Sequence, residues 1–495
     1  MISKKTSVAL MASLTLALGA CEKNLDAINA NPNNAEVGNP AYILTGAERE
    51  NIFRLFDVPI NQDGASLIIQ HWAKVQYTDE DRYAFRPGSY QSIWDGFYAD
   101  GLQDFNELIR IGKERNNPNL QAVGLIMRSY FFSVLTDTYG DIPYSEALQL
   151  SSNVLAPKYD AQQDIYTDLL AQLKAASGLI KTDGPEVGGD VIYEGDMNKW
   201  QRFANSLRLR LAMRIADANE TLARTEVADV LNGTNRLISS NAENAQFAFL
   251  NSSSNFNPVY VNRLTRDDHR VSRTITSHLA RLKDPRLTVY ANPAECGAPA
   301  SFEVGPDSTG LYRGIPNGLT NVNVAKLGPL CSSSKVGDAF TAAEAPGVLM
   351  TYAEVLFFKA EAIARGFVTG DAKAEYENGI RASMNQHGFT GAAVDEYIAQ
   401  PSVAYNAANF GKQSIGEQKW IALFGQGVEA WSEWRRLDSP QLRVAANPAG
   451  AAAGKIPVRF RYPANEQSTN AANRAAAVAR QGADLLTTKV WWDKF

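Results

Sequence analysis

The chain has 495 residues, and its apolar content of 45% is ordinary for a folded globular protein, which excludes general disorder. Its formal net charge is −5, and it becomes −7 without residues 1–20, which hold Lys4 and Lys5 and no acidic residue. A mildly acidic chain lacks the clustered Lys and Arg that nucleic acid and anionic lipid surfaces require, so we expect no nucleic acid partner.

The start of the chain predicts an export signal. Lys4 and Lys5 precede an apolar run at 8–18, which is far shorter than the roughly 20 residues that a membrane-spanning helix needs. The run ends in Leu-Gly-Ala before Cys21, a pattern that resembles the lipobox of bacterial lipoproteins. We therefore expect a lipoprotein signal peptide at 1–20 and lipidation of Cys21. The alternative is an ordinary signal with a cysteine nearby by chance.

Helical periodicity dominates the rest of the chain, and the expected helices come in consecutive pairs. Pairs without strands between them favour an all-α, tetratricopeptide-like scaffold of helix–turn–helix units, interrupted by long irregular loops. The expected pairs are 90–112 with 119–139, 160–181 with 198–218, 351–366 with 371–387, and 416–424 with 428–437.

Local signals support several of these helices. Residues 122–139 are apolar nearly all round, which predicts a central buried helix that Gly140 ends. Capping boxes beginning at Thr351 and Ser414 predict the starts of two later helices. The four arginines of the helix at 198–218 predict a solvated or ion-paired face rather than a nucleic acid site.

Cys296 and Cys331 are the only cysteines after Cys21. In an exported protein they can form one disulfide, and two free buried thiols are the alternative. The four histidines are scattered without a metal-binding spacing, so we expect neither a metal nor a cofactor.

Stretches of low periodicity are expected at 57–89, 234–272, 285–348 and 438–483, and loops of that length usually bind ligands or partners. Their aromatic, charged and amide side chains suit neutral nutrients, although each loop could equally pack onto the scaffold through its own aromatic residues. The candidate ligand-binding residues are Trp72, Tyr77, Arg82, Tyr83, Phe85, Tyr260, Asn262, Arg263, Tyr312, Arg313 and Asn317.

Nine blocks in chain order resemble the SusD/RagB family of outer-membrane nutrient-binding lipoproteins. Among them are YGDIPY at 139–144 and WQRFANSLRLR at 200–210. The other blocks lie at 90–94, 282–286, 352–361, 418–420, 429–436, 456–463 and 491–492.

The resemblance implies a single α-helical SusD-like domain over residues 21–495 with ligand-binding loops inserted. It also implies a lipid-anchored protein on the outer membrane, facing the cell exterior, that holds the membrane by its anchor only. Its expected partners are an oligosaccharide or peptide ligand and a TonB-dependent, SusC-like transporter that receives the captured ligand.

The expected function is binding rather than catalysis. No GxSxG nucleophile motif occurs, and no pair among the many acidic residues stands out as a glycosidase dyad. Two alternatives remain at this point: a scaffold that binds only protein, and a lipid-anchored glycan hydrolase.

Overall fold

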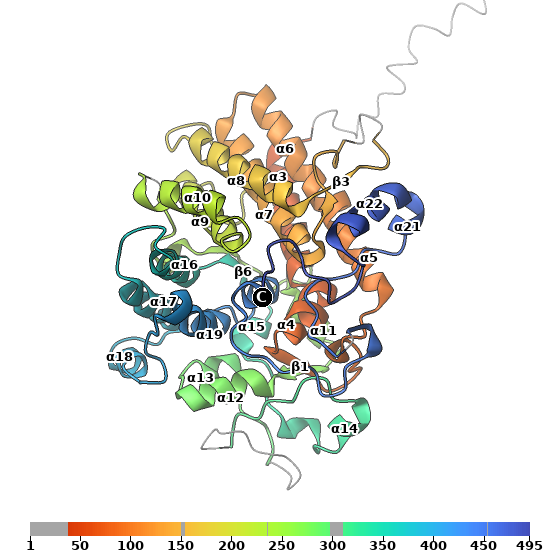
Figure 1. Ribbon diagram of the computed structural model, residues 1–495, viewed down its shortest axis with the longest axis vertical. Coiled ribbons are helices and arrows are strands. Elements are labelled where there is room, and N and C mark those ends of the chain that lie inside the picture. Colours follow the sequence, from red (N-terminus) through yellow and green to blue (C-terminus); the bar gives the residue numbers. More distant parts are fainter. Residues whose placement is uncertain (1–37, 150–153, 235, 298–309, 453) are drawn as a thin grey trace, which may run out of the picture.

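The computed structural model describes residues 38–149, 154–234, 236–297, 310–452 and 454–495. The expected signal peptide and Cys21 lie outside the described residues. The described chain is mostly helical, with a few short strands (Figure 1), which confirms the expected all-α class. None of the described helices is both long and apolar enough to span a membrane.

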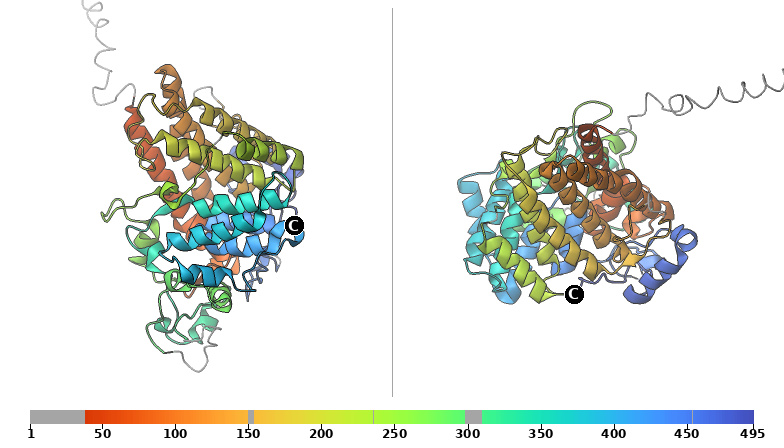
Figure 2. Two further views of the ribbon diagram at one scale, coloured as in Figure 1. Left: turned by 90° about the vertical axis from the view of Figure 1, so that its left-hand side faces the viewer. Right: turned by 90° about the horizontal axis from the view of Figure 1, so that it is seen from above.

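The expected helix pairs are present. The two helices of each pair pack against each other, and neighbouring pairs are also in contact. The chain reverses direction between paired helices, through short connections in three pairs and through residues 180–196 in the fourth, so the helices stack in rows, as the side view in Figure 2 shows. The pairs are α6 (Gln103–Glu114) with α7 (Pro118–Tyr139), α8 (Gln162–Leu179) with α9 (Met197–Arg214), α16 (Tyr352–Ala364) with α17 (Ala372–Gln386), and α19 (Lys412–Ala422) with α20 (Gly427–Leu437).

The central helix α7 is buried on almost every side, as its apolar sequence predicts. Asn117 caps its first turn by accepting a hydrogen bond from the backbone N–H of Leu120 at 3.0 Å. The helix stops at Gly140, which has φ of +87°, a backbone conformation that favours glycine.

The capping predictions had opposite outcomes. The Thr351 hydroxyl accepts from the backbone N–H of Glu354 at 3.2 Å and caps α16. The prediction for Ser414 is wrong, because α19 already begins at Lys412 after Gly411 and Ser414 lies inside its first turn. There the Ser414 hydroxyl bonds back to the carbonyl oxygen of Gly411 at 3.2 Å.

Several helices were not expected from the sequence. The predicted loop at 438–483 in fact holds α21 (Glu466–Thr469) and α22 (Ala471–Gln481). The other helices outside the predicted pairs are α3 (Pro40–Phe56), α4 (Ser66–Ile68), α10 (Glu220–Asn232), α11 (Pro258–Arg263), α12 (Arg273–Leu282), α13 (Leu287–Tyr290), α14 (Asn321–Ala325), α15 (Asp338–Thr341) and α18 (Ala392–Ile398). The expected helix at 90–112 is divided: α5 (Pro87–Asp95) forms its start, and a π-helical segment at Gly96–Leu102 leads from α5 into α6.

Three antiparallel strand pairs tie distant parts of the described chain together. They are β1 (Trp72–Lys74) with β5 (His269–Val271), β2 (Ile142–Pro143) with β3 (Tyr159–Asp160), and β4 (Ala245–Phe247) with β6 (Gly347–Met350).

The arginines of α9 pair with acids rather than facing solvent. Arg210 and Arg214 are buried, and their guanidinium groups bind Glu354 at 2.7 Å and Glu429 at 2.6 Å. Of the two expected arrangements, the ion-paired one is therefore correct for these residues, and their partners come from α16 and α20.

Candidate ligand-binding surface

The three segments that supply the candidate residues converge around β1, β5 and α14, in the lower part of Figure 1. Strand β1 pairs with β5, so that Trp72 lies opposite Val271. Ser272, directly after β5, forms a β-bridge with Ile315. The expected loops therefore form one continuous unit rather than three separate ones.

Asn317 fastens this unit at its centre. Its Nδ2 donates to the carbonyl oxygen of Trp72 and to Oδ1 of Asp81, both at 2.7 Å. Its Oδ1 accepts from the hydroxyl of Ser272 at 2.5 Å. One buried amide thus bridges all three segments, because a single Asn side chain both donates and accepts.

Asp81 is the acidic partner in this arrangement. Burial raises its pKa to about 6, although hydrogen bonds from the backbone N–H of Gly318 and from Asn317 act to lower it. The carboxyl group is enclosed on all sides, so it holds the loops together rather than meeting a ligand.

A second buried charge cluster lies beneath β1. The Lys74 ammonium lies 3.1 Å from Asp63 and 3.0 Å from Glu80, and His269 Nε2 lies 2.8 Å from Asp63. Burial alone would lower the pKa of Lys74, but Asp63 and Glu80 together raise it above its ordinary value. Lys74 therefore stays charged, and its ion pairs anchor the strand pair.

Four candidate residues have structural roles. Trp72 and Tyr83 are 1% and 2% exposed in the hydrophobic core, and the Tyr83 hydroxyl oxygen accepts from the backbone N–H of Ala445. Arg313 is buried and donates to the carbonyl oxygens of Ser332 and Cys296. The scaffold encloses these three side chains, whereas Asn317 is 9% exposed and also lines a groove of about 540 Å³.

Tyr77 is the candidate that reaches solvent. Its ring is 51% exposed, and the guanidinium of Arg266 lies over it, 5.1 Å from the ring centre. Tyr77 has φ of +49°, a left-handed conformation that costs a non-glycine residue about 1 to 3 kcal/mol. Such conformations persist only where the surroundings impose them, and they are frequent at ligand clamps.

Helix α11 precedes Arg266, which contacts Tyr77, and carries three further candidates. The Tyr260 ring meets Phe256 edge-on at 5.0 Å, and Asn262 Nδ2 donates to Gln62 Oε1 at 2.9 Å. Partial burial lowers the pKa of Arg263, against the opposing charge of Asp267. All three side chains remain partly accessible.

The last three candidates are partly exposed at the edge of the unit. Arg82 Nε donates to the carbonyl oxygen of Asn447 at 2.9 Å, and Phe85 packs against Phe460 with ring centres 5.3 Å apart. Tyr312 is half-buried and packs against the core.

The sequence analysis missed three exposed residues in the segment that reaches Tyr77. Val261 on α11 and Leu264 directly after it are 45% and 58% exposed, and Arg266, whose guanidinium lies over the Tyr77 ring, follows them. Two apolar side chains three residues apart at the end of a short helix would have been the available signal. We define the Tyr77 surface as Tyr77, Val261, Asn262, Leu264 and Arg266.

A groove of about 480 Å³ opens at the edge of the Tyr77 surface. Such a groove offers apolar faces with polar groups at its sides, which suits recognition by stacking and hydrogen bonding. Its lining residues are Glu50, Phe53, Arg54, Asp57, Val58, Pro258, Val261, Asn262 and Thr265.

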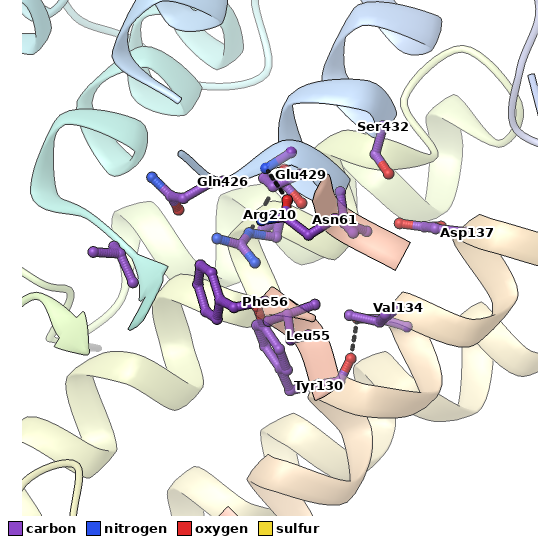
Figure 3. Close-up of a pocket in the computed structure, with 14 residues that line it drawn as sticks. Leu55, Phe56, Asn61, Tyr130, Val134, Asp137, Arg210, Gln426, Glu429 and Ser432 are labelled. Atoms are coloured by element: carbon purple, nitrogen blue, oxygen red, sulfur yellow. Dashed lines mark hydrogen bonds and ion pairs between the residues drawn. The ribbon is translucent and has the colours of Figure 1, made fainter. Parts of the chain in front are cut away.

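A small cavity inside the helix array is not a ligand site. It has a volume of about 20 Å³, enough for about one water molecule, and lies among α3, α7, α9 and α20. Figure 3 shows Arg210 and Glu429 on one side of it and Phe56 and Tyr130 on the other. The oxygen of the Gln426 side chain also lines it without a hydrogen-bond partner in the described chain.

Cys296 and Cys331 form a disulfide, with their Cα atoms 5.4 Å apart, as the sequence allowed. The backbone N–H of Cys296 also donates to the carbonyl oxygen of Cys331 at 3.1 Å. Arg313, which donates to the Cys296 carbonyl oxygen, links this crosslink to the bridge between Ser272 and Ile315.

A family profile and solved structures both match this chain. The profile of the SusD-like family, described as "Starch-binding associating with outer membrane", matches residues 32–463. No curated protein matches the chain.

Solved structures match over nearly the whole chain. A chitin-binding protein is 30% identical, with a TM-score of 0.81, and the match covers 92% of this chain and 100% of that one. A chitin-binding SusD homologue from Flavobacterium johnsoniae is 26% identical, with a TM-score of 0.77 and coverage of 92% and 97%. A SusD homologue from Bacteroides fragilis is 26% identical, with a TM-score of 0.76 and coverage of 92% and 99%.

Proposed function

The chain belongs to the SusD-like family, and on that premise we propose that it captures an oligosaccharide at the outer membrane without altering it chemically. N-acetylglucosamine oligomers are the first ligands to test, because two of the similar structures are chitin-binding proteins.

The proposal includes a membrane anchor and a transport partner. Cleavage after residue 20 and lipidation of Cys21 would hold the protein on the outer membrane, facing outward, with residues 21–495 as one domain. The captured oligosaccharide would then pass to a TonB-dependent, SusC-like transporter. Retention beside a transporter raises the effective ligand concentration, so we expect a dissociation constant in the micromolar range.

The observation that carries the proposal is the Tyr77 surface. A sugar ring has an apolar face that packs on an aromatic ring and hydroxyl groups that bind polar side chains. Tyr77 supplies an exposed aromatic face, Arg266 supplies donors above it, and Asn262 lies at the neighbouring groove. The left-handed backbone at Tyr77 is the conformational cost of presenting that ring outward.

The test is a binding measurement on the soluble chain that begins at Glu22. Isothermal titration calorimetry would compare N-acetylglucosamine oligomers, glucose oligomers and short peptides. We expect an oligosaccharide to bind and Tyr77→Ala to weaken it at least tenfold. Tyr42→Ala is the matched control, because Tyr42 is also exposed but lies in the first turn of α3.

Two results would contradict the proposal. Binding of peptides alone would mean that the ligand is a peptide and not an oligosaccharide. Hydrolysis of a bound glycan would mean that the protein is an enzyme. Equal loss of affinity in Tyr77→Ala and Tyr42→Ala would remove the assignment of the site.

A further inference from the structure

A separate groove of about 550 Å³ lies beside α5, β2 and α21, toward the right-hand side of Figure 1. None of its lining residues belongs to the Tyr77 surface. Trp94 lies on α5 and lines the groove, and Leu148 and Leu155 form apolar walls. We call this the Trp94 groove.

Trp94 presents an unused hydrogen-bond donor there. The side chain is 6% exposed, and aromatic rings, including those of Tyr139 and Tyr159, pack around it. Its indole N–H makes no hydrogen bond with another described residue, and the side chain lines the groove. In contrast, the indole groups of Trp200 and Trp492 donate to Asp190 at 2.7 Å and Asp137 at 2.8 Å.

An indole N–H in such a position requires an acceptor. A largely buried donor without a partner costs free energy, so the acceptor has to come from water or from a bound molecule. The ring cannot turn away to solvent, because its aromatic neighbours fix it. The groove therefore favours a ligand that brings an oxygen to this point.

The charges around the groove narrow the ligand class. Asp95, Glu146 and Glu466 line it, whereas no Lys, Arg or His does so in the part of the chain that the structure describes. Asp95 is exposed and lines the groove, so its carboxylate can accept from a ligand. An anionic ligand would be repelled, which leaves neutral or cationic ones.

We propose that the Trp94 groove is a second glycan site that takes the acetamido group of an N-acetylhexosamine unit. The carbonyl oxygen of that group would accept from the Trp94 indole, and its N–H would donate to Asp95. Its methyl group would lie against Leu148 and Leu155. A glucose unit has hydroxyls but no acetamido methyl group to fill that apolar wall. This inference rests on the proposed oligosaccharide function.

The test observes the Trp94 indole directly, by NMR of protein labelled with ¹⁵N at the indole nitrogens. The chain has 8 tryptophans, and Trp94→Phe identifies the Trp94 signal as the one that it removes. We expect the N-acetylglucosamine trimer to shift this signal in the native protein and in Tyr77→Ala. The glucose trimer, at the same concentration, should leave it unmoved.

Calorimetry gives a second reading and separates the two proposals. We expect Trp94→Phe to weaken one of two binding events at least fivefold and to leave the event at the Tyr77 surface unchanged. Its thermal unfolding midpoint should stay near that of the native chain, because Phe retains an aromatic ring at this position.

If the trimer binds while the Trp94 signal does not shift, the groove proposal is wrong and the proposed function stands. If the signal shifts only when Tyr77 is intact, the groove is not an independent site. If no glycan binds, both proposals are wrong.

Discussion

Arg436 and Glu361 form a bidentate ion pair in which both nitrogen–oxygen distances are 2.6 Å and each side chain is 1% exposed. The pair joins α20 to α16. Burial alone would raise the pKa of Glu361, but Arg436 and Arg365 lower it to about 2. Arg436 also binds Glu433 at 2.7 Å, and Glu433 in turn binds the buried Lys419, also at 2.7 Å. The helix array is therefore held together by ion pairs as well as by apolar packing.

Breaking this pair should destabilise the fold strongly. Arg436→Leu leaves Glu361 and Glu433 buried with one fewer cation, and removing one partner of a buried pair costs about 3 to 5 kcal/mol. Urea unfolding would measure the loss. Arg110→Leu is the control, because Arg110 makes exposed pairs with Glu107 and Glu114, whose loss should destabilise the fold far less. Equal losses in the two variants would contradict this account.

Glu48 should make stability depend on pH. It is fully buried, and burial together with the nearby Asp190 raises its pKa well above the ordinary 4.5. The folded protein therefore keeps a proton that the unfolded chain releases, so this contribution to stability is present below pH 4.5 and is lost as pH rises toward the folded-state pKa. Glu48→Gln keeps an uncharged hydrogen-bonding group at that position.

We expect Glu48→Gln to gain stability relative to the native chain as pH rises, with no gain in acid. Urea unfolding across a series from about pH 4 to about pH 8 would record the difference. Glu50→Gln serves as the control, because Glu50 is on the same helix but exposed. A constant difference at every pH would show that Glu48 does not hold the extra proton.

Trp72 and Tyr77 should respond to substitution in different ways. Trp72→Ala removes a fully buried indole and should cost about 3 to 5 kcal/mol in unfolding free energy. Tyr77→Ala should change stability by less than about 0.5 kcal/mol, because half of its ring is already exposed. Chemical denaturation of both variants would measure this contrast. A strongly destabilised Tyr77→Ala would mean that the ring packs onto the scaffold instead of serving the surface.

The disulfide should stabilise the fold by restricting the unfolded chain. Its cysteines are 35 residues apart, and the chain-entropy relation gives about 4 kcal/mol for a loop of that size. Cys296→Ser with Cys331→Ser should lower the unfolding free energy by up to that amount. Comparison with the native chain under reducing conditions separates loss of the crosslink from loss of the thiols. Equal stability of the native chain in oxidising and reducing buffer would contradict the prediction.

Much of the helical scaffold could be predicted because its signals are local. Gly140 ends α7 and Thr351 caps α16 through residues that are adjacent in the sequence. The ion-pair partners could not be assigned, since Glu354 lies 144 residues from Arg210 and Glu429 lies 215 from Arg214. Helix α22 was missed because it is rich in alanine and buries only Ala477, so it has no apolar stripe.

The candidate surface could be predicted only as a set of segments. Sequence gives Trp72 and Tyr77 the same aromatic signal, but pairing of β1 with β5 buries Trp72. The turn that follows β1 then directs Tyr77 outward through a left-handed backbone that no nearby glycine predicts. Which aromatic side chain faces solvent thus depends on a strand almost two hundred positions away.

Asn317 holds the backbone of the candidate surface in place without contributing to the side chains that a ligand would contact. Its amide bonds to the backbone of Trp72 and to side chains that are themselves buried, none of which belongs to the Tyr77 surface. Exposed side chains such as Tyr77, Leu264 and Arg266 can therefore be exchanged without loosening the fastening beneath them. A scaffold of this kind can acquire new ligands through substitutions of its outermost residues alone, while the Asn317 amide continues to fix the positions of the segments that carry them.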